Sequence, residues 1–476
     1  MGGAMLPKGV SRELVIEELI GYTGKDVDWR TGRVLSGLYD PGKDAHELSI
    51  EAYTRFLAQN ALYFNMYPSI GNLERDVVAS LAELLRADDE VVGNITSGGT
   101  ESILLAVKAA RDWARENRPE VKEPEIVLPV SAHPAFIKGA QYFGLTVKQT
   151  DLDLSEFRAD ITSFRDALSN NTIIAVGSAP NFSHGSIDPI REMAELAGER
   201  NILFHVDGCV GGIYLSIMRR MGEKLADFDF SVPGVTSFSV DLHKYGYAPK
   251  NASAILYRNR ELRKHAWFVC SSTTAYVVIN PTAQSSRSGG PVAAAWSILR
   301  YFGEDGYQNI VRTSQEATKQ MLEGIAEIEG IEVLGRPDMC MFTLASGDVN
   351  IFEVDDELNL RGWKMVPQFA CGGSPANLHV SLTQANVPHA GFFVDDLKEV
   401  VGTLRREGSK VNTGELTSIV EGVADQPVEE IMAAVIPHIG LSGMDLPEKM
   451  APLNTVLNLL PAGKRDQLLT FFFNMF

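Results

Sequence analysis

The segment DLHKYGYAPK (241–250) places a histidine and two lysines directly after SFSV (237–240), a short apolar run typical of a buried strand. Most lysines are solvated surface groups, and that is the simplest interpretation of Lys244. In a partly buried pocket, however, a lysine tends to have a lowered pKa, and its neutral amine can then form an imine with a carbonyl group. Lys244 is therefore a candidate nucleophile, with His243 beside it.

A glycine turn earlier in the chain could hold a phosphate group. Gly98 and Gly99 precede Thr100, a good helix N-cap, and Ile103, Leu104 and Val107 then follow at helical spacing. The N-terminus of such a helix offers free backbone N–H groups and the positive end of the helix dipole, which suit an anion. Taken alone, the segment is better explained as an ordinary glycine turn with a threonine cap.

Two further polar residues follow predicted strands. Asp207 ends the apolar run NILFHVD (201–207), where a carboxylate could cap the next turn or keep a heteroaromatic ring nitrogen protonated. His133 follows EIVLPV (125–130), where an imidazole could stack on a flat ring or serve as an ordinary hydrogen-bonded histidine.

A phosphate cradle, a ring-facing histidine, a carboxylate for a ring nitrogen and an imine-forming amine are together what pyridoxal 5'-phosphate requires. Each signal is weak alone, but the ordered set predicts an enzyme that binds this cofactor. The glycine spacing matches neither a Walker loop nor a dinucleotide fingerprint. We predict no metal site.

The elements that must position these residues alternate in a way typical of α/β proteins. Short apolar runs alternate with amphipathic helical patterns, which predicts a largely parallel sheet with helices on both faces. The predicted strands of this sheet are EIVLPV (125–130), TIIAVG (172–177), NILFHVD (201–207), SFSV (237–240) and ASAILY (252–257).

The length of 476 residues exceeds the roughly 100–200 residues usual for one domain. We predict a helical N-terminal segment (1–72), a large cofactor-binding domain (73–305) and a smaller C-terminal α/β domain with a helical tail (306–476). The strands predicted for the small domain are IEVL (331–334), CMFTLA (340–345) and VNIFEV (349–354).

Composition excludes several classes of partner. The formal net charge of −18 argues against a nucleic-acid partner, because neutralising phosphates needs concentrated Lys and Arg. No apolar run approaches the roughly 20 residues of a membrane helix, so we expect no membrane anchor. The N-terminal residues lack the pattern of a signal peptide, and four scattered cysteines argue against a disulfide framework. We therefore expect a cytoplasmic protein.

Five segments resemble the motifs of sphingosine-1-phosphate lyase, a member of the group II decarboxylase branch of fold-type I pyridoxal-phosphate enzymes. They are TSGGTES (96–102), SAHPAF (131–136), HVDGCVGG (205–212), DLHKYGYAPK (241–250) and SRSGGPVAAAW (286–296). The resemblance runs from about residue 30 to about residue 400. It implies the fold-type I architecture and retro-aldol cleavage of a phosphorylated long-chain amino alcohol to an aldehyde and phosphoethanolamine.

The same resemblance implies roles for residues within these motifs. Lys244 would form the imine with the cofactor, Asp207 would pair with the pyridine nitrogen, and His133 would stack on the ring. His243 would assist near the cofactor. The residues implied around the cofactor phosphate are Ser97, Gly98, Gly99 and Thr100. Those implied to approach it from the other subunit of a homodimer are Ser288, Gly289 and Gly290.

The residues implied to bind substrate match the family only in part. Lyases of this family bind the substrate phosphate with a tyrosine, a histidine and a second lysine. Tyr39 fits the tyrosine and Lys250 fits the lysine, but Tyr63 stands where the histidine is expected and supplies no positive charge. The loop CSSTTAYVVINPTAQSS (270–286) also differs from the lyases, in a region where substrate is expected.

Two other functions stay open on the sequence. The same cofactor residues support α-decarboxylation of an amino acid, because the bond that breaks is the one oriented perpendicular to the cofactor ring. Tyr63 and the altered loop would then select a substrate that carries a carboxylate. A cofactor-binding scaffold without catalysis is the third possibility, and the complete set of site residues argues against it.

Overall fold

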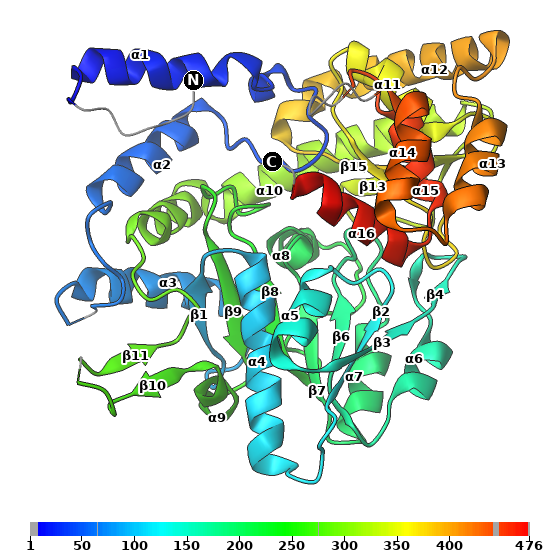
Figure 1. Cartoon of the computed structure of the whole chain (residues 1–476). Helices are drawn as coiled ribbons and strands as arrows, with labels where there is room; N and C mark the ends of the chain where they lie inside the picture. Colours follow the sequence, from blue (N-terminus) through cyan, green and yellow to red (C-terminus); the bar gives the residue numbers. More distant parts are fainter. Residues whose placement is uncertain (1–7, 64, 275, 441–446, 475–476) are drawn as a thin grey trace.

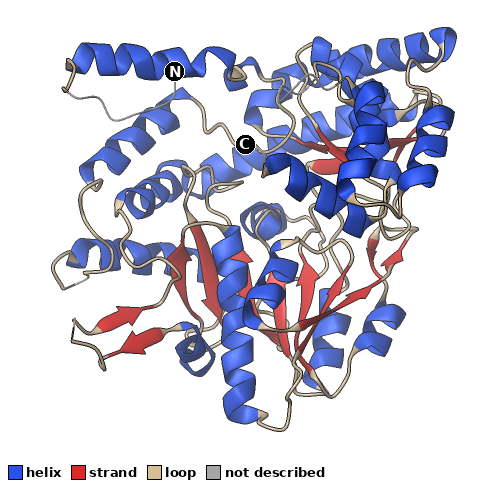
Figure 2. Ribbon diagram, in the orientation of Figure 1, coloured by secondary structure: helices blue, strands red, loops and turns tan. Residues whose placement is uncertain are grey.

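A computed structural model describes residues 8–63, 65–274, 276–440 and 447–474 of the chain. Its largest feature is a seven-stranded sheet with the order β1-β9-β8-β7-β6-β2-β3 (Figures 1 and 2). β9 pairs antiparallel with β1 and β8, and the other pairs are parallel, which confirms the predicted largely parallel sheet. The strands are β1 Val92–Thr96, β2 Glu125–Pro129, β3 Thr146–Thr150, β6 Thr172–Ser178, β7 Leu203–Asp207, β8 Val235–Val240 and β9 Ser253–Tyr257.

Helices cover both faces of this sheet because its strands are apolar on both sides. Ile126 and Ile174 pack with α4 (Gly99–Asn117) and α5 (Ala135–Phe143) in one core, whereas their neighbours Val127 and Ala175 belong to a second, larger core. Both α4 and α5 lie in front of the sheet in Figure 1. The other helices of this region are α3 Pro68–Leu84, α6 Ile161–Ala167, α7 Ile190–Gly198, α8 Gly211–Arg220 and α9 Arg260–Arg263.

Two short hairpins extend from the large sheet's connections. β4 (Leu152–Asp153) pairs with β5 (Arg158–Ala159), and β10 (Phe268–Cys270) pairs with β11 (Val278–Asn280). The second hairpin projects from the molecule beside β1 and α9 in Figure 1, and Phe268 and Val269 are exposed on it.

A long helix, α10 (Gly290–Ala326), leads from the large sheet to a second sheet and leaves helical geometry at Gly303, where φ is 53°. The second sheet is antiparallel and has the order β12-β13-β15-β14. Its elements are β12 Ile331–Val333, β13 Met341–Ser346, α11 Ile351–Leu360, β14 Val366–Gln368, β15 Asn377–Ser381 and α12 Ala390–Glu407.

The prediction of a strand at 349–354 is wrong, because this segment begins α11. Asn350 is the N-cap, and its side chain accepts a hydrogen bond from the Phe352 N–H at 3.0 Å. Ile351, Phe352, Val354 and Leu358 are then buried at helical spacing. A short apolar run fits a buried strand and a buried helix equally well, so periodicity over six residues could not decide.

The ends of the chain are helical. The N-terminal helices are α1 Arg12–Tyr22 and α2 Lys43–Arg55, and those after residue 412 are α13 Thr413–Val423, α14 Val428–Ile439, α15 Ala451–Leu459 and α16 Ala462–Phe473. α2 packs against α10, whereas α1 has no buried residue. The carboxylate of Asp356 on α11 accepts the N–H groups of Met450 and Ala451 at 2.8 and 2.9 Å and so fastens the start of α15. The two predicted domain limits fall inside helices, since residue 72 lies in α3 and residue 305 lies in α10. The domain limits therefore stay predictions.

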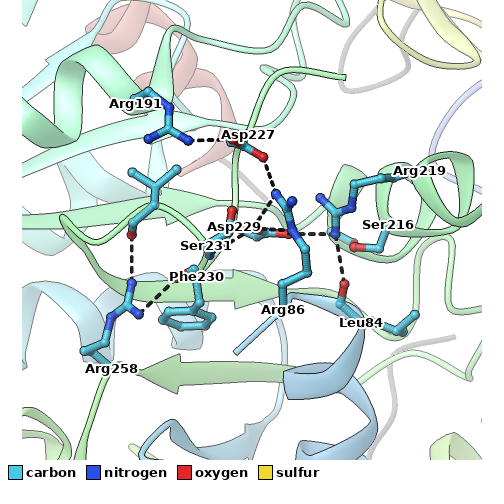
Figure 3. A network of polar contacts seen from close by, with 12 residues as sticks. Leu84, Arg86, Arg191, Ser216, Arg219, Asp227, Asp229, Phe230, Ser231 and Arg258 are labelled. Carbon is cyan, nitrogen blue, oxygen red and sulfur yellow. Dashed lines mark hydrogen bonds and ion pairs between the residues drawn. The ribbon is translucent and has the colours of Figure 1, made fainter. Parts of the chain in front are cut away.

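A network of ion pairs fixes the loop that leads into β8 (Figure 3). The side chain of Asp229 is fully buried and pairs with Arg86 at 3.0 Å and with Arg219, near the end of α8, at 2.7 Å. Arg258 donates to the carbonyl of Phe230 in the same loop and to that of Val235, the first residue of β8. The network joins α8, which follows Asp207, to the loop before β8, which precedes Lys244. It therefore helps to fix the position of Asp207 relative to Lys244.

No helix in the described part of the chain is both long enough and apolar enough to cross a membrane.

Candidate active site

A cavity of about 590 Å³ opens where β1, β2, β7 and β8 end. Ligands in α/β proteins gather at this carboxyl edge of the sheet, because the loops after parallel strands meet there. The predicted residues that line the cavity are Ser97, Gly98, Gly99, Thr100, His133, Asp207, His243, Lys244 and Lys250. The fold therefore brings the amine, the carboxylate, both imidazoles and the glycine turn to one place.

The glycine turn packs directly against the floor of the cavity. Gly98 is the N-cap of α4, and the helix begins at Gly99. A Cβ atom on Gly99 would lie 2.8 Å from both carboxylate oxygens of Asp241 and 3.0 Å from Sγ of Cys209. Only glycine fits there, so the first-turn N–H groups of α4 reach the cavity without side chains between.

Lys244 is paired with a buried carboxylate. Its Nζ lies 2.9 Å from Oδ2 of Asp241, whose side chain is 2% exposed, and Ser253 Oγ donates to Oδ1 at 2.6 Å. Burial lowers the pKa of Lys244, but Asp241 outweighs burial and the net pKa is raised. Burial raises the pKa of Asp241, and the charges of Lys244 and His243 reverse this to a net lowering. The expectation of a lowered lysine pKa is therefore wrong for Lys244 beside Asp241.

Asp207 ends β7 and presents one oxygen to the cavity. Its Oδ1 accepts the N–H of Cys209 at 3.0 Å and the hydroxyl of Ser239 at 3.3 Å. Within the described residues no donor is hydrogen-bonded to Oδ2. One oxygen thus fixes the orientation of the carboxylate and leaves the other for a ligand.

The two histidines of the cavity are held in defined roles. Nδ1 of His133 accepts the Ala135 N–H at 3.2 Å, so this nitrogen carries no proton. Nδ1 of His243 lies 2.9 Å from the Ala252 carbonyl, which can only accept, so this nitrogen is protonated. Burial lowers the pKa of both rings. The charge of a nearby aspartate, Asp207 for His133 and Asp241 for His243, raises the pKa but does not cancel the effect of burial. Both imidazoles are therefore neutral near pH 7, and Nε2 of His243 is free to accept a proton.

A second, mostly apolar cavity of about 340 Å³ shares His243 and Lys250 with the first and includes Tyr39. Nζ of Lys250 donates to the Gly37 carbonyl at 3.2 Å and lies 5.3 Å from the ring centroid of Tyr39. Burial raises the pKa of Tyr39 to about 12. Tyr39 therefore stays a hydrogen-bond donor next to a cation.

Five predicted residues do not line the main cavity of a single chain, and one of them, Tyr39, lines the second cavity instead. Tyr63 is exposed. Ser288 Oγ donates to the Leu57 carbonyl at 2.9 Å, and the Gly289 N–H donates to Gln59 at 2.8 Å. Gly290 packs against Tyr53, and its neighbour Ser288 lines a smaller cavity of about 230 Å³ together with Ser97.

Two carboxylates of the site were missed by the sequence analysis. Asp241 stands three residues before Lys244, but only the folded turn shows that their side chains meet. Glu101 lines the cavity and is 7% exposed, so it is a buried acid in the first turn of α4. An acidic residue in a first helical turn is common, and its burial has no signal in sequence.

Comparison with known proteins identifies the family. Residues 28–343 match the model of the pyridoxal-dependent decarboxylase conserved domain, and residues 414–475 match a C-terminal HTH domain of pyridoxal-dependent enzymes. The sphingosine-1-phosphate lyase of Oryza sativa subsp. japonica is 38% identical over 414 residues, which cover 85% of this chain and 75% of that protein. The chain belongs to the sphingosine-1-phosphate lyase family.

The solved structure of Burkholderia pseudomallei sphingosine-1-phosphate lyase aligns with a TM-score of 0.81 at 33% identity, over 90% of this chain and 98% of that one. The L-aspartate/L-glutamate decarboxylase of Pyrococcus horikoshii is 31% identical over 75% of this chain and 90% of its own length. The resemblance predicted from the five motifs and the fold-type I architecture are thereby confirmed. Members of this lyase family depend on pyridoxal phosphate, which is the cofactor of this chain.

The residues of the cavity fit that cofactor. The glycine turn leaves first-turn N–H groups open for a phosphate, Oδ2 of Asp207 has no donor of its own among the described residues, and Lys244 lies within the same cavity. A volume of about 590 Å³ leaves room for a substrate beside a single pyridine ring.

Proposed function

We propose that this protein cleaves the Cα–Cβ bond of a phosphorylated long-chain amino alcohol to give an aldehyde and phosphoethanolamine. The observation that carries the proposal is a cation and a phenol at the edge of a lysine-containing cofactor cavity, in a chain of the sphingosine-1-phosphate lyase family. Lys250 and Tyr39 can bind a phosphate through an ammonium group and a hydroxyl group. The neighbouring cavity has little other charge to offer.

The residues of the cavity take complementary roles in this proposal. Lys244 attaches the cofactor through its aldehyde, and the segment from Ser97 to Thr100 binds the cofactor phosphate. Asp207 holds a proton on the ring nitrogen, and His133 packs against the ring. When bound, pyridoxal phosphate supplies an electron sink for the pair left on Cα as the Cα–Cβ bond breaks.

His243 is our candidate for removing the β-hydroxyl proton. Its Nδ1–H is used by the Ala252 carbonyl, which leaves Nε2 as an acceptor on the cavity wall. The lowered pKa of the ring keeps that nitrogen unprotonated at neutral pH. Asp241, 3.7 Å from Nε2, can stabilise the imidazolium formed when the proton arrives.

Decarboxylation of an amino acid is the second candidate. It is favoured by the similarity to the Pyrococcus decarboxylase and by Tyr63, which adds no cation for a phosphate. The deciding experiment incubates the reconstituted enzyme with a phosphorylated sphingoid base and, separately, with a panel of amino acids. Formation of aldehyde and phosphoethanolamine supports the lyase, whereas carbon dioxide release from an amino acid alone overturns it.

Lys250→Ala should raise KM for the phosphorylated substrate by roughly 10–100-fold, because a charge-assisted hydrogen bond to the phosphate is lost. The effect on kcat should be small, since Lys250 is assigned to the substrate phosphate and not to the bond that breaks. Steady-state kinetics check this, with Lys224→Ala as the control, because Lys224 is exposed and does not line the cavity. An unchanged KM would remove Lys250 from the phosphate site.

We further propose a homodimer with shared active sites. α1 supports it, because a helix of 11 residues without a buried residue has little stability of its own. Several apolar side chains of α1 are exposed, namely Leu14, Val15, Ile16, Leu19 and Ile20. Ser288, Gly289 and Gly290 lie outside the main cavity of their own chain, where a second copy could use them.

Replacing Leu19 and Ile20, which are 60% and 63% exposed, with glutamate should weaken the dimer at least about 100-fold, because charges would enter an apolar contact. Sedimentation velocity over a dilution series measures the dimer dissociation constant, and Glu17→Gln on the same helix is the control. Equal dissociation constants for the variant and the wild type would show that α1 is not part of the interface.

The remaining partner expectations are also proposals. Residues 413–476 contain three Lys or Arg against eight Asp or Glu, so we infer that the HTH-like module does not bind nucleic acid. Four free cysteines in the described chain agree with a reducing compartment such as the cytoplasm.

A further inference from the structure

Glu101 joins two parts of the active site that belong to different elements. Its Oε2 accepts the N–H of Ser97, in the glycine turn, at 2.5 Å. Its Oε1 accepts the N–H groups of Ala283 and Gln284 at 2.7 and 3.2 Å. No lysine, arginine or histidine of the described chain forms an ion pair with it, so its charge is balanced by N–H dipoles and the α4 N-terminus.

The turn that Glu101 holds directly follows the β10–β11 hairpin. Asn280 ends β11, and its side chain accepts the N–H and hydroxyl of Thr282 and donates to the Gln284 carbonyl at 2.9 Å. These bonds fold residues 280–284 into a tight turn. Within it, the N–H groups of Ala283 and Gln284 point at Oε1 of Glu101, which is typical of an anion nest. The base of the exposed hairpin is therefore fastened to Glu101.

Both ends of this link line the main cavity. Ser97 lines it beside Gly98 and Gly99, and Ala283 and Gln284 line it as well. We propose that Glu101 is a positioning residue that couples the cofactor-phosphate cradle to the β10–β11 hairpin. This inference rests on the proposed binding of the cofactor phosphate at the α4 N-terminus. Cofactor binding fixes Ser97, Glu101 and the turn together, and a fixed hairpin in turn strengthens cofactor binding.

Glutamine at this position separates the two halves of the link. An amide has one acceptor oxygen and one donor nitrogen, so it can accept from Ser97 or from the turn but not from both. Glu101→Gln should therefore raise the dissociation constant of pyridoxal phosphate roughly tenfold. A purely electrostatic role predicts the opposite sign, because removing a negative charge near a bound phosphate would tighten binding.

The experiment measures hydrogen exchange of residues 276–284 in the full-length protein, with and without pyridoxal phosphate, beside cofactor titrations. Wild-type protein should show slower exchange in this segment when the cofactor binds, and Glu101→Gln should lose that response. Glu116→Gln, an exposed acid on the same helix that pairs with Lys264, should behave as wild type. Asn280→Ala loosens the turn without touching the glycine segment and should also weaken cofactor binding.

The outcomes are distinct from those that test the proposed function. Wild-type protein that does not bind pyridoxal phosphate at all would overturn the proposed function. Wild-type binding combined with an unchanged exchange response or tighter cofactor binding in Glu101→Gln would overturn this inference alone. If Glu101→Gln does not fold, Asn280→Ala decides, because wild-type affinity in that variant excludes coupling through the turn.

Discussion

Lys244→Ala should lower kcat by at least roughly 10⁴-fold and remove the yellow absorption of the cofactor-loaded protein, because the amine that attaches the cofactor is gone. The substitution has a second effect, since it leaves the buried Asp241 carboxylate without its partner at 2.9 Å. Breaking a buried pair in this way costs roughly 3–5 kcal/mol of stability. Loss of activity in the alanine variant alone could therefore reflect unfolding.

Lys244→Arg separates the two effects. A guanidinium keeps a positive charge beside Asp241 and preserves the fold, but it cannot form the bond with the cofactor aldehyde. Thermal unfolding near the wild-type temperature together with absent colour and activity is the expected result. Borohydride reduction of the wild type followed by peptide mapping should place a pyridoxyl group on Lys244. A label on another lysine, or on none, would contradict the assignment.

The sequence allowed a good prediction wherever one residue type could serve only one purpose in the fold. The central strands are apolar on both faces, as Ile126 and Val127 illustrate by packing into different cores. Because the ends of parallel strands meet at one edge, Asp207 and Lys244 could be placed together from their positions after such strands. The glycine turn was predictable because glycine is used where space is lacking: the structure leaves no room for a side chain at Gly99.

Features set by long-range contacts could not be predicted. The pKa of Lys244 is raised and not lowered, because Asp241 lies 2.9 Å from it across a turn. The shape of that turn cannot be predicted from the sequence alone. Residues 351–354 are helical because Asn350 caps α11 and the buried face of this helix packs against α12, α15 and β15. Ser288 donates to the Leu57 carbonyl at 2.9 Å, a contact between segments 231 residues apart that no local pattern specifies.

Asp207→Asn should lower kcat by roughly 10²–10³-fold while the protein still folds and binds the cofactor. The amide oxygen can still accept from the Cys209 N–H and the Ser239 hydroxyl, so the side chain keeps its orientation. The group facing the cavity becomes an NH₂ in place of an anionic oxygen, and it cannot hold a proton on the ring nitrogen. Without that proton, the ring is a poorer acceptor for the electron pair released at Cα.

A cofactor analogue with carbon in place of the ring nitrogen tests whether the carboxylate acts through that atom. The analogue should slow the wild type to about the rate of Asp207→Asn, and it should slow the variant no further, because both changes remove one interaction. Ser239→Ala is the matched control, since it deletes only one of the two bonds to Oδ1 and should change kcat by less than roughly tenfold. Full multiplication of the two losses would show that Asp207 supports the fold of the cavity and not the chemistry of the ring.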